Sequence, residues 1–500
     1  MSCNGKLFRD PVHGYIEVPD EWCRKFVDTE VFQRLRFIEQ SSMRMLFPAA
    51  RHDRFIHSLG VYSIAKRVYA AIEHRIHESF QHDEWVCKRF KNTFLIAALL
   101  HDCGHSPFSH TGEELARKYC PSIESKLLNA IGSENFRTDF YRSDASKYAT
   151  HELASAYVGC KTFESVFGDS IDKEQFARMI TGIKNWKDYS LEKRVYNCLI
   201  SLINGFIVDV DRLDYLQRDT WATGICNASV DVERLISGID INVEKGRVCV
   251  KHTALSCIVN AVAARDYIFQ WVITNHIVSY ANEILKRAME DLVKALSSSD
   301  AHAIDVGEML FSPDRLIQGG DVVICGEKIF MPTDGDFLYL MKKYIPHSEY
   351  FKAYSRRDKT HISLWKTHAE FANIFMSILE HRFEKSFYDV DFWDMFAERL
   401  QGFSEKNPFC LCTEPRPIKT TRHSICKVDA NIEESYSQSI LGKENLDLTY
   451  VFGSLGKEIR YNFNAFVNAE ESESNRSLAK STIEKLQSLL KDTIEEFNNP

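Results

Sequence analysis

The chain has 500 residues, of which 62 are basic and 70 acidic, so its formal net charge is -8. Hydrophobic residues make up 44% of it, which excludes wholesale disorder, and the mild acidity argues against a protein that coats nucleic acid. At roughly 100–200 residues per domain, the length predicts one large domain with an appended piece, or two to three domains.

The first half of the chain has mainly helical periodicity. Apolar residues recur at helical spacing in five segments, residues 26–40, 57–76, 84–100, 189–205 and 211–219. Between residues 238 and 251 the period changes to two around the turn sequence Glu-Lys-Gly-Arg. This change predicts a β-hairpin.

The second half mixes helix and strand signals. Residues 256–296 contain neither glycine nor proline and predict one or two long helices. Loop and short-strand signals occupy residues 298–335, helical spacing returns over 365–401, and residues 446–467 alternate as strands do. The last segment predicts an amphipathic helix for docking or self-association, because one stripe carries Ile483, Leu486, Leu490, Ile494 and Phe497.

The sequence predicts a soluble protein with no membrane contact. The N-terminus lacks an apolar signal core, and the longest purely apolar run, Phe94–Leu100, is far shorter than the ~20 residues that a membrane span needs. The 14 cysteines are scattered, as is expected of reduced thiols in a cytoplasm. We therefore expect a cytoplasmic location, with a nuclear one left open for a eukaryotic source.

Histidines and aspartates form the most informative pattern. Eight of the 18 histidines lie between residues 52 and 110. A single buried histidine is more often a hydrogen-bonded core residue than a ligand, but His101-Asp102 directly follows an apolar helix, where an unpaired carboxylate is costly to bury. Two imidazoles and two carboxylates would neutralise a divalent ion and leave positions open for water and substrate. Such a set suits Mn, Mg, Fe, Zn or Co.

Three motifs carry a resemblance to a known family. They are Arg54-x-x-His57, His101-Asp102-x-Gly-His105-x-Pro-Phe-Ser-His110 and Asp209-Val-Asp211-Arg212-Leu-Asp214-Tyr215-x-x-Arg218-Asp219. These motifs resemble those of the HD-domain deoxynucleoside triphosphate triphosphohydrolases, as does the opening Phe8-x-Asp10-Pro-Val-His13-Gly. The likeness is dense over residues 6–225 and thinner to about residue 300.

The resemblance implies a mainly α fold, with an HD-domain helical core and a smaller α+β C-terminal region. We expect a catalytic core with an N-terminal nucleotide-contacting segment over residues 1–300, the α+β region over 301–470, and a linker with the amphipathic helix over 471–500. It also implies one divalent metal per active site, held by His57, His101, Asp102 and Asp211.

The implied reaction is attack of a metal-activated water on the α-phosphorus of a dNTP, which releases deoxynucleoside and inorganic triphosphate. His110 is the candidate general acid. Glu113 lies three residues later, so on a helix it could orient His110 and favour its imidazolium form; alternatively it is a solvated first-turn residue. His105 and His151 resemble two further active-site histidines of the family.

Several residues resemble the family's substrate contacts. Arg54 and Arg212 would hold the triphosphate, because guanidinium pairs with phosphate through its bidentate fork. Gln40, Tyr215 and Asp219 would contact the sugar. The chain departs from the family where a phosphate-binding arginine is expected, since it has Asn275-His276 there, and either residue could take that place.

A regulatory site is implied near the N-terminus. Lys6, Asp28, Gln33 and Arg36 resemble residues that hold an activating guanine nucleotide, GTP or a dNTP, between subunits, which implies a homo-oligomer, with a tetramer favoured. The alternative is that Asp28-Thr29 caps a helix beginning near Glu30, and that Arg36 is solvated.

Two questions stay open at this stage. Cys410, Cys412, His423 and Cys426 could form a small zinc site or be free residues, and the last 200 residues could bind a regulatory protein partner. The alternatives to a dNTP triphosphohydrolase are an HD phosphodiesterase or nuclease, and a nucleotide-sensing subunit that acts through a partner. A role as a dGTPase in antiviral defence is compatible with the sequence and not decided by it.

Overall fold

The computed structural model shows a mainly helical protein with a few small sheets, as the sequence predicts. It describes residues 5–142, 148–205, 209–299, 306–317, 321–356, 361–367, 370–371, 373–375, 378, 390–406, 410–413, 416–419, 446–447, 459–462, 464–468 and 475–498. In this part of the chain, no helix is both long and apolar enough to cross a membrane.

The N-terminus forms an antiparallel hairpin of β1 (Gly5–Asp10) and β2 (Gly14–Pro19). A single helix over residues 26–40 was the wrong prediction, because this segment divides into a π-helical turn at Cys23–Val27, α2 (Glu30–Gln33) and a 3-10 turn at Arg34–Phe37. The buried Arg34 donates to the carbonyl oxygens of His105 and Pro332, and these long-range bonds accompany the irregular backbone.

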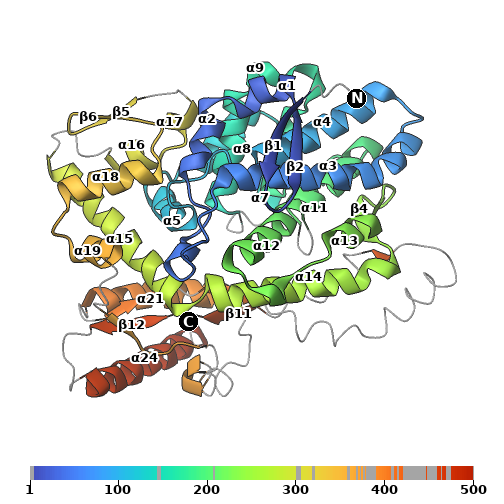
Figure 1. The fold of residues 1–500 in the computed structure, drawn as a ribbon. Helices are drawn as coiled ribbons and strands as arrows, with labels where there is room; N and C mark the ends of the chain where they lie inside the picture. Colours follow the sequence, from blue (N-terminus) through green and yellow to red (C-terminus); the bar gives the residue numbers. More distant parts are fainter. Residues whose placement is uncertain are drawn as a thin grey trace.

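Helices form the body of the first 300 residues (Figure 1). They are α3 (Arg54–Ser79), α4 (Glu84–Leu100), α5 (His110–Tyr119), α6 (Ile123–Ile131), α7 (Glu134–Arg142), α8 (Thr150–Thr162), α9 (Glu164–Phe167), α10 (Lys173–Thr181), α11 (Leu191–Ile203), α12 (Val210–Thr223), α13 (Val232–Gly238), α14 (Leu255–Ile268) and α15 (His276–Ser299). The predicted hairpin is confirmed as β3 (Ile239–Asn242) paired with β4 (Arg247–Val250). The Gly- and Pro-free segment gives two helices, joined through a π-helical turn at Phe269–Ile273.

The main core lies around α3 and α4. Both helices pack together along apolar faces that include the fully buried Tyr62, Tyr69 and Phe94. Asp53 accepts from the backbone N–H of Ile56 and so caps the N-terminus of α3. The helix therefore begins at Arg54, and its first turn faces the site described below.

The elements beyond residue 300 contribute to a second core that also includes residues of α5 and α15, and to a third core near the C-terminal end of the chain. They comprise α16 (Val306–Phe311), α17 (Asp314–Ile317), β5 (Asp321–Ile324), β6 (Glu327–Phe330), α18 (Asp334–Tyr344), α19 (Glu349–Arg356), β7 (His361–Ser363), α21 (Val390–Lys406), β8 (Cys410–Cys412), β9 (Arg416–Lys419), β10 (Leu446–Asp447), β11 (Ile459–Asn462), β12 (Ala465–Asn468) and α24 (Asn475–Asn498). Among them, β12 pairs with both β7 and β8.

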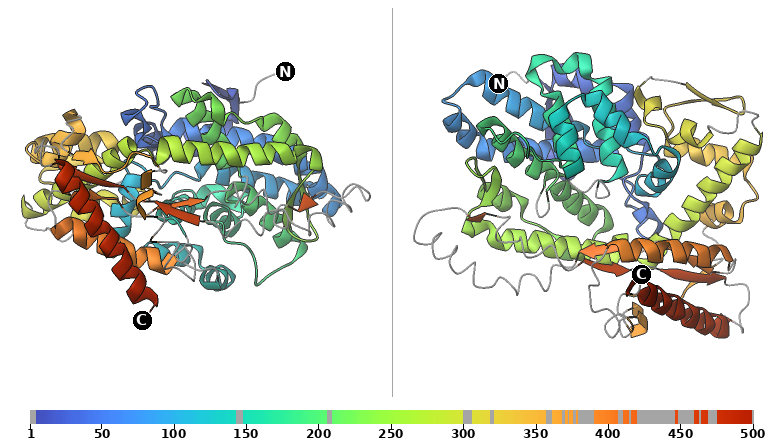
Figure 2. Two further views of the ribbon diagram at one scale, coloured as in Figure 1. Left: turned by 90° about the horizontal axis from the view of Figure 1, so that it is seen from below. Right: turned by 180° about the vertical axis from the view of Figure 1, so that it is seen from behind.

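The last helix docks within the chain. Figure 1 and Figure 2 show α24 at the periphery, beside α21. Its stripe residues Leu486, Leu490 and Ile494 are buried in a cluster with Phe392 and Trp393 of α21. The amphipathic pattern thus marked an intramolecular docking face.

Candidate metal centre and active site

Three helix ends bring the four predicted metal ligands together. His57 lies in the first turn of α3, and His101 and Asp102 follow the end of α4. Asp211 lies in the first turn of α12, which Asp209 caps by accepting from the N–H of Arg212 at 2.7 Å.

Each of the two candidate aspartates lies within 4 Å of both candidate histidines. His57 Nε2 lies 2.9 Å from Asp211 Oδ1 and 3.7 Å from Asp102 Oδ2. His101 Nε2 lies 3.5 Å from Asp102 Oδ2 and 3.8 Å from Asp211 Oδ1. His57, His101 and Asp102 are buried, whereas the Asp211 side chain is 41% exposed, so the cluster has one open side.

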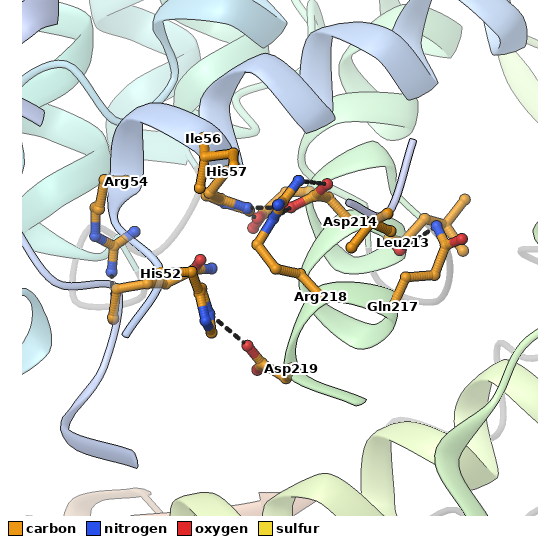
Figure 3. A network of polar contacts seen from close by, with 12 residues as sticks. His52, Arg54, Ile56, His57, Leu213, Asp214, Gln217, Arg218 and Asp219 are labelled. Atoms are coloured by element: carbon orange, nitrogen blue, oxygen red, sulfur yellow. Dashed lines mark hydrogen bonds and ion pairs between the residues drawn. The ribbon is translucent and has the colours of Figure 1, made fainter. Parts of the chain in front are cut away.

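Both histidines are held through Nδ1, which directs Nε2 toward the centre. His57 Nδ1 donates to Asp214 Oδ2 at 2.7 Å (Figure 3), and His101 Nδ1 donates to the carbonyl oxygen of Ala98 at 2.9 Å. The buried His101 Nε2 has no hydrogen-bond partner among the described residues. Such an orphaned lone pair among carboxylates fits a divalent metal ion, since metal-bound histidines are usually fixed through their other nitrogen in this way.

The charges of the cluster perturb its ionisable groups. Burial alone would lower the pKa of His57, but hydrogen bonds and charges from Asp211 and Asp214 raise that pKa to about 10. Burial opposes ionisation of Asp102, but Arg54 and the surrounding histidines hold the pKa of its carboxyl well below the usual range. A cation at this point would meet ionised carboxylates.

A second cluster of histidines lies beside the first. His105 and His151 stack with ring centroids 4.6 Å apart, and His110 lies 5.3 Å from His105. Glu113 Oε2 bridges two of them, at 3.1 Å from His110 Nδ1 and 3.0 Å from His151 Nδ1. Glu113 is buried, so the alternative of a solvated first-turn residue is wrong.

The shared carboxylate charges one histidine in preference to the other. Although burial disfavours its imidazolium form, the charge of Glu113 raises the pKa of His151 to about 9. Desolvation in the crowded site lowers the pKa of His110 despite its bond to Glu113. Glu113 itself raises the pKa of His110, as expected, but desolvation outweighs this effect.

Arg54 links the two clusters and lies among the predicted substrate contacts. Its Nη1 donates to Asp102 at 2.6 Å, its Nε to Ser109 at 2.8 Å and its Nη2 to the carbonyl oxygen of Gln40 at 3.2 Å. The amide oxygen of Gln40 is buried and lacks a partner among the described residues. Arg54 and Gln40 thus lie beside the metal centre.

The remaining substrate candidates lie on α12. Asp211, Tyr215 and Asp219 are spaced by four residues and so follow one face of this helix. Arg212 is held by Asp209 at 3.4 Å. His52 also lies beside this helix, because its Nε2 is 2.9 Å from Asp219 Oδ1 (Figure 3). The sequence did not single it out, although it lies in the histidine-rich segment.

Asn275 and His276, which stand where the family has a phosphate-binding arginine, differ in their surroundings. Asn275 Oδ1 accepts from the N–H of Ile277 and so serves the start of α15. His276 instead lines a cavity of about 330 Å³ with Tyr280 and Lys366. Asn275 is therefore a helix-terminal residue, and His276 is the one that faces open space.

The four predicted regulatory residues lie in one surface region. Lys6 Nζ donates to Asp28 at 3.3 Å, and Gln33 accepts from Arg36 at 2.8 Å while donating to the carbonyl oxygen of Val27. Thr29 makes no side-chain capping bond at the start of α2, and Asp28 pairs with Lys6. The capping part of the alternative is thus not observed, whereas Arg36 is exposed as that alternative expects. An activator site stays a prediction.

The predicted zinc site is only partly within the described residues. Cys410 and Cys412 are buried on β8 with sulfur atoms 3.8 Å apart. His423 and Cys426 lie outside the described residues, so the alternatives of a four-ligand zinc site and of free residues both stay open.

Part of the chain is similar to proteins that are already known. Residues 54–188 match the model of the HD domain. The uncharacterized protein YwfO of Bacillus subtilis is 29% identical over 282 residues, which cover 56% of this chain and 54% of that protein. The deoxynucleoside triphosphate triphosphohydrolase SAMHD1 of Xenopus laevis is 32% identical over 239 residues, which cover 46% of this chain and 36% of that protein. The chain spans 54–62% of the length of the first relatives that it matches.

A solved structure supports the fold. The phosphohydrolase of Bacteroides thetaiotaomicron superposes with a TM-score of 0.57 at 17% identity, over 93% of this chain and 99% of that one. The segment that matches the HD-domain model begins at Arg54 and contains His57, His101 and Asp102. Over residues 54–188 this chain is therefore an HD domain, with the histidines and aspartate of a divalent-metal site at its centre.

Proposed function

We propose that this protein is a metal-dependent phosphohydrolase that converts a dNTP and water to deoxynucleoside and inorganic triphosphate. The observation that carries the proposal is the adjacency of two clusters of different chemistry. The first contains the metal-ligand set His57, His101, Asp102 and Asp211, and the second contains the Glu113-linked histidines. The similarity to several proteins named SAMHD1 supports dNTPs as the substrate class.

In this mechanism the two clusters have different tasks. A divalent ion in the first cluster would lower the pKa of a bound water and neutralise charge on phosphoryl oxygens. Arg54 adds positive charge directly beside that cluster, and the charged His151 adds more from the second. Both cations favour the binding of a polyphosphate.

His110 is suited to protonate the departing 5′-oxygen. Its Nδ1 is held by Glu113, so Nε2 is left to carry the proton for the leaving group, and the negative charge of a bound polyphosphate would favour the imidazolium form that donates it. When water attacks the α-phosphorus, the bond from this phosphorus to the 5′-oxygen breaks. Protonation of that oxygen gives the deoxynucleoside, and all three phosphates leave together as triphosphate.

The same proposal includes regulation by nucleotides. Lys6 and Arg36 would contact phosphates and Asp28 would accept from a guanine edge, at an interface between copies of this chain. The observation in favour is that these side chains form one continuous surface region beside α2.

Product chromatography tests the reaction. Protein loaded with Mn²⁺ or Mg²⁺ is incubated with each dNTP, alone and with GTP and the other dNTPs added. Deoxynucleoside and triphosphate are expected, and they should be lost in Asp211→Asn but retained in Asp492→Asn, which changes an exposed aspartate of α24.

Other products would identify an alternative. Monophosphate and pyrophosphate would overturn the predicted leaving group. Cleavage of oligonucleotides or cyclic nucleotides in place of dNTPs would establish a phosphodiesterase, and tight nucleotide binding with no turnover under any mixture would establish a sensor.

A further inference from the structure

The turn of the N-terminal hairpin reaches a residue that orients a metal ligand. His13 lies between β1 and β2, and its Nε2 is 2.6 Å from Asp214 Oδ1. The two side chains are 3% and 0% exposed. Asp214 in turn accepts from Nδ1 of His57 through its other oxygen, at 2.7 Å. A single carboxylate therefore joins the hairpin turn to the metal centre.

Asp214 is held on all sides by hydrogen-bond donors. Besides the two imidazoles, Arg218 donates to Oδ2 through Nε and to Oδ1 through Nη2, both at 2.9 Å (Figure 3). The third nitrogen of that guanidinium, Nη1, donates to Asp10 Oδ2 at 2.8 Å. The network contains two carboxylates and one guanidinium, and it is almost completely buried.

Asp10 has a second task, which connects the network to the backbone of the turn. Its Oδ1 accepts the N–H groups of Val12 and His13, each at 2.7 Å. The same side chain therefore shapes the turn and fixes Arg218. Any movement of the hairpin turn would shift both donors that surround Asp214.

Gly60 leaves the space that the network occupies. It lies on α3, three residues after His57, and a Cβ at this position would lie 1.9 Å from Asp214 Oδ1 and 2.4 Å from Arg218 Nη2. Helical glycine is normally less favourable than alanine. Here the missing side chain lets the carboxylate and guanidinium pack against the helix.

We propose that His13 and Asp10 are positioning residues for the metal centre, so that the β1–β2 turn controls how His57 presents Nε2 to the metal. This inference rests on the metal site of the proposed function, but not on the identity of the substrate. The physical basis is that a carboxylate hydrogen-bonded to a ligand histidine fixes its ring and tautomer, and that loss of such a partner commonly costs 10–100-fold in metal affinity or activity.

Metal titration of the full chain tests the role of His13. In His13→Ala, the dissociation constant for Mn²⁺ measured by calorimetry should rise about tenfold, and the visible spectrum of the Co²⁺-loaded protein should change. In His13→Gln, a side-chain N–H can still donate to Asp214, so affinity and spectrum should largely return. His74→Ala, an exposed histidine of α3, is the matched control.

Gly60→Ala tests the network without removing any polar atom. It should weaken Mn²⁺ binding about tenfold by displacing Asp214 and Arg218. Gly402→Ala is the matched control, because a Cβ there meets nothing within 4 Å. Circular dichroism and thermal unfolding of each variant establish that it is folded at the titration temperature.

The outcomes separate this inference from the proposed reaction. Folded His13→Ala and Gly60→Ala proteins with the native Mn²⁺ affinity and Co²⁺ spectrum would overturn the positioning role. So would an equal loss in His13→Gln and His13→Ala. A wild-type protein that binds Mn²⁺ but hydrolyses no dNTP would overturn the proposed reaction and leave the inference supported wherever the metal affinities follow the predicted order.

Discussion

At the scale of single residues, the charge of Glu113 is shared between two histidines. It is buried and faces His110 and His151 with the same carboxylate oxygen. The pKa of His151 is raised from 6.5 to about 9, so this ion pair stabilises the folded protein fully below about pH 6.5 and loses that contribution as the pH rises through 9. The pKa of Glu113 is lowered from 4.5, so the contribution is also lost in acid.

We therefore expect a pH-dependent effect of Glu113→Gln. At pH 5.5 it should lower the free energy of unfolding by about 1–3 kcal/mol, because a charged hydrogen-bond partner of a buried imidazolium is lost. The cost should shrink at pH 9.5, where His151 is neutral in the wild-type protein. Urea unfolding at the two pH values measures both differences. A cost that is independent of pH would contradict the pairing, and Glu134→Gln, at an exposed position of α7, should change little at either pH.

His52 and Asp219 support a second residue-scale prediction. Their bond of 2.9 Å leaves His52 Nδ1 buried and without a partner among the described residues. Gln40, whose backbone N–H donates to the carbonyl oxygen of His52, has a similarly unpaired amide oxygen. Polar atoms left in this way are costly unless a ligand satisfies them. If this pair binds the sugar hydroxyl of a dNTP, then Asp219→Asn and His52→Ala should each raise KM about tenfold, equivalent to about 1.4 kcal/mol, with a smaller change in kcat.

Steady-state kinetics on the full chain checks this split. The Mn²⁺ dissociation constant of both variants should stay native, because neither side chain contacts the metal-ligand set. A loss of kcat at unchanged KM would contradict a substrate-binding role. These two residues are separated by 167 positions in the chain, so no local pattern could have paired them.

At the scale of elements, periodicity predicted the regular helices and failed where long-range polar contacts shape the backbone. The helices α3, α4, α11 and α12 were predicted because each buries one apolar face over several turns. Residues 26–40 have similar spacing, yet their helix is broken beside the buried Arg34, whose partners include a carbonyl oxygen 298 residues away. Likewise, the four metal-ligand candidates followed from local motifs, whereas His13 and its partner Asp214, 201 positions apart, did not.

The C-terminal helix α24 allows a test of an element prediction that the structure bears out. Leu490 is 1% exposed and packs in the cluster with Phe392 and Trp393. Leu490→Ala should lower the free energy of unfolding of this region by about 2–4 kcal/mol, through lost burial and the cavity that remains. Ser488→Ala, on the exposed face of the same helix, should stay within about 0.5 kcal/mol. Denaturation of each variant measures the difference, and equal stabilities would contradict docking of α24.

At the scale of the whole molecule, the first 300 residues and the elements beyond them share a core. Phe108 and Leu115, which flank or belong to α5, pack in one cluster with Leu292 of α15 and with Phe337 and Leu411 from beyond residue 300. The helix that begins at His110 is thus supported from both sides of the predicted boundary. That boundary stays a prediction, but changes in the C-terminal region have a direct packing route to the helix that carries His110 and Glu113.

Assembly is the prediction that involves the molecule as a whole. Bringing two copies together at the region of Lys6, Asp28, Gln33 and Arg36 would place unlike charges around a shared anionic nucleotide, whose phosphates neutralise the two cations. We expect GTP together with dNTPs to shift the sedimentation coefficient toward a tetramer, and to raise the rate of hydrolysis in parallel. In Lys6→Ala and Arg36→Ala, the nucleotide concentration needed for half of each response should rise about tenfold or more. The Mn²⁺ affinity of both variants should stay native. Sedimentation velocity at fixed protein concentration distinguishes activation through assembly from a direct effect of the nucleotide on catalysis. An unchanging monomer with full activity would show that the surface region has no part in assembly.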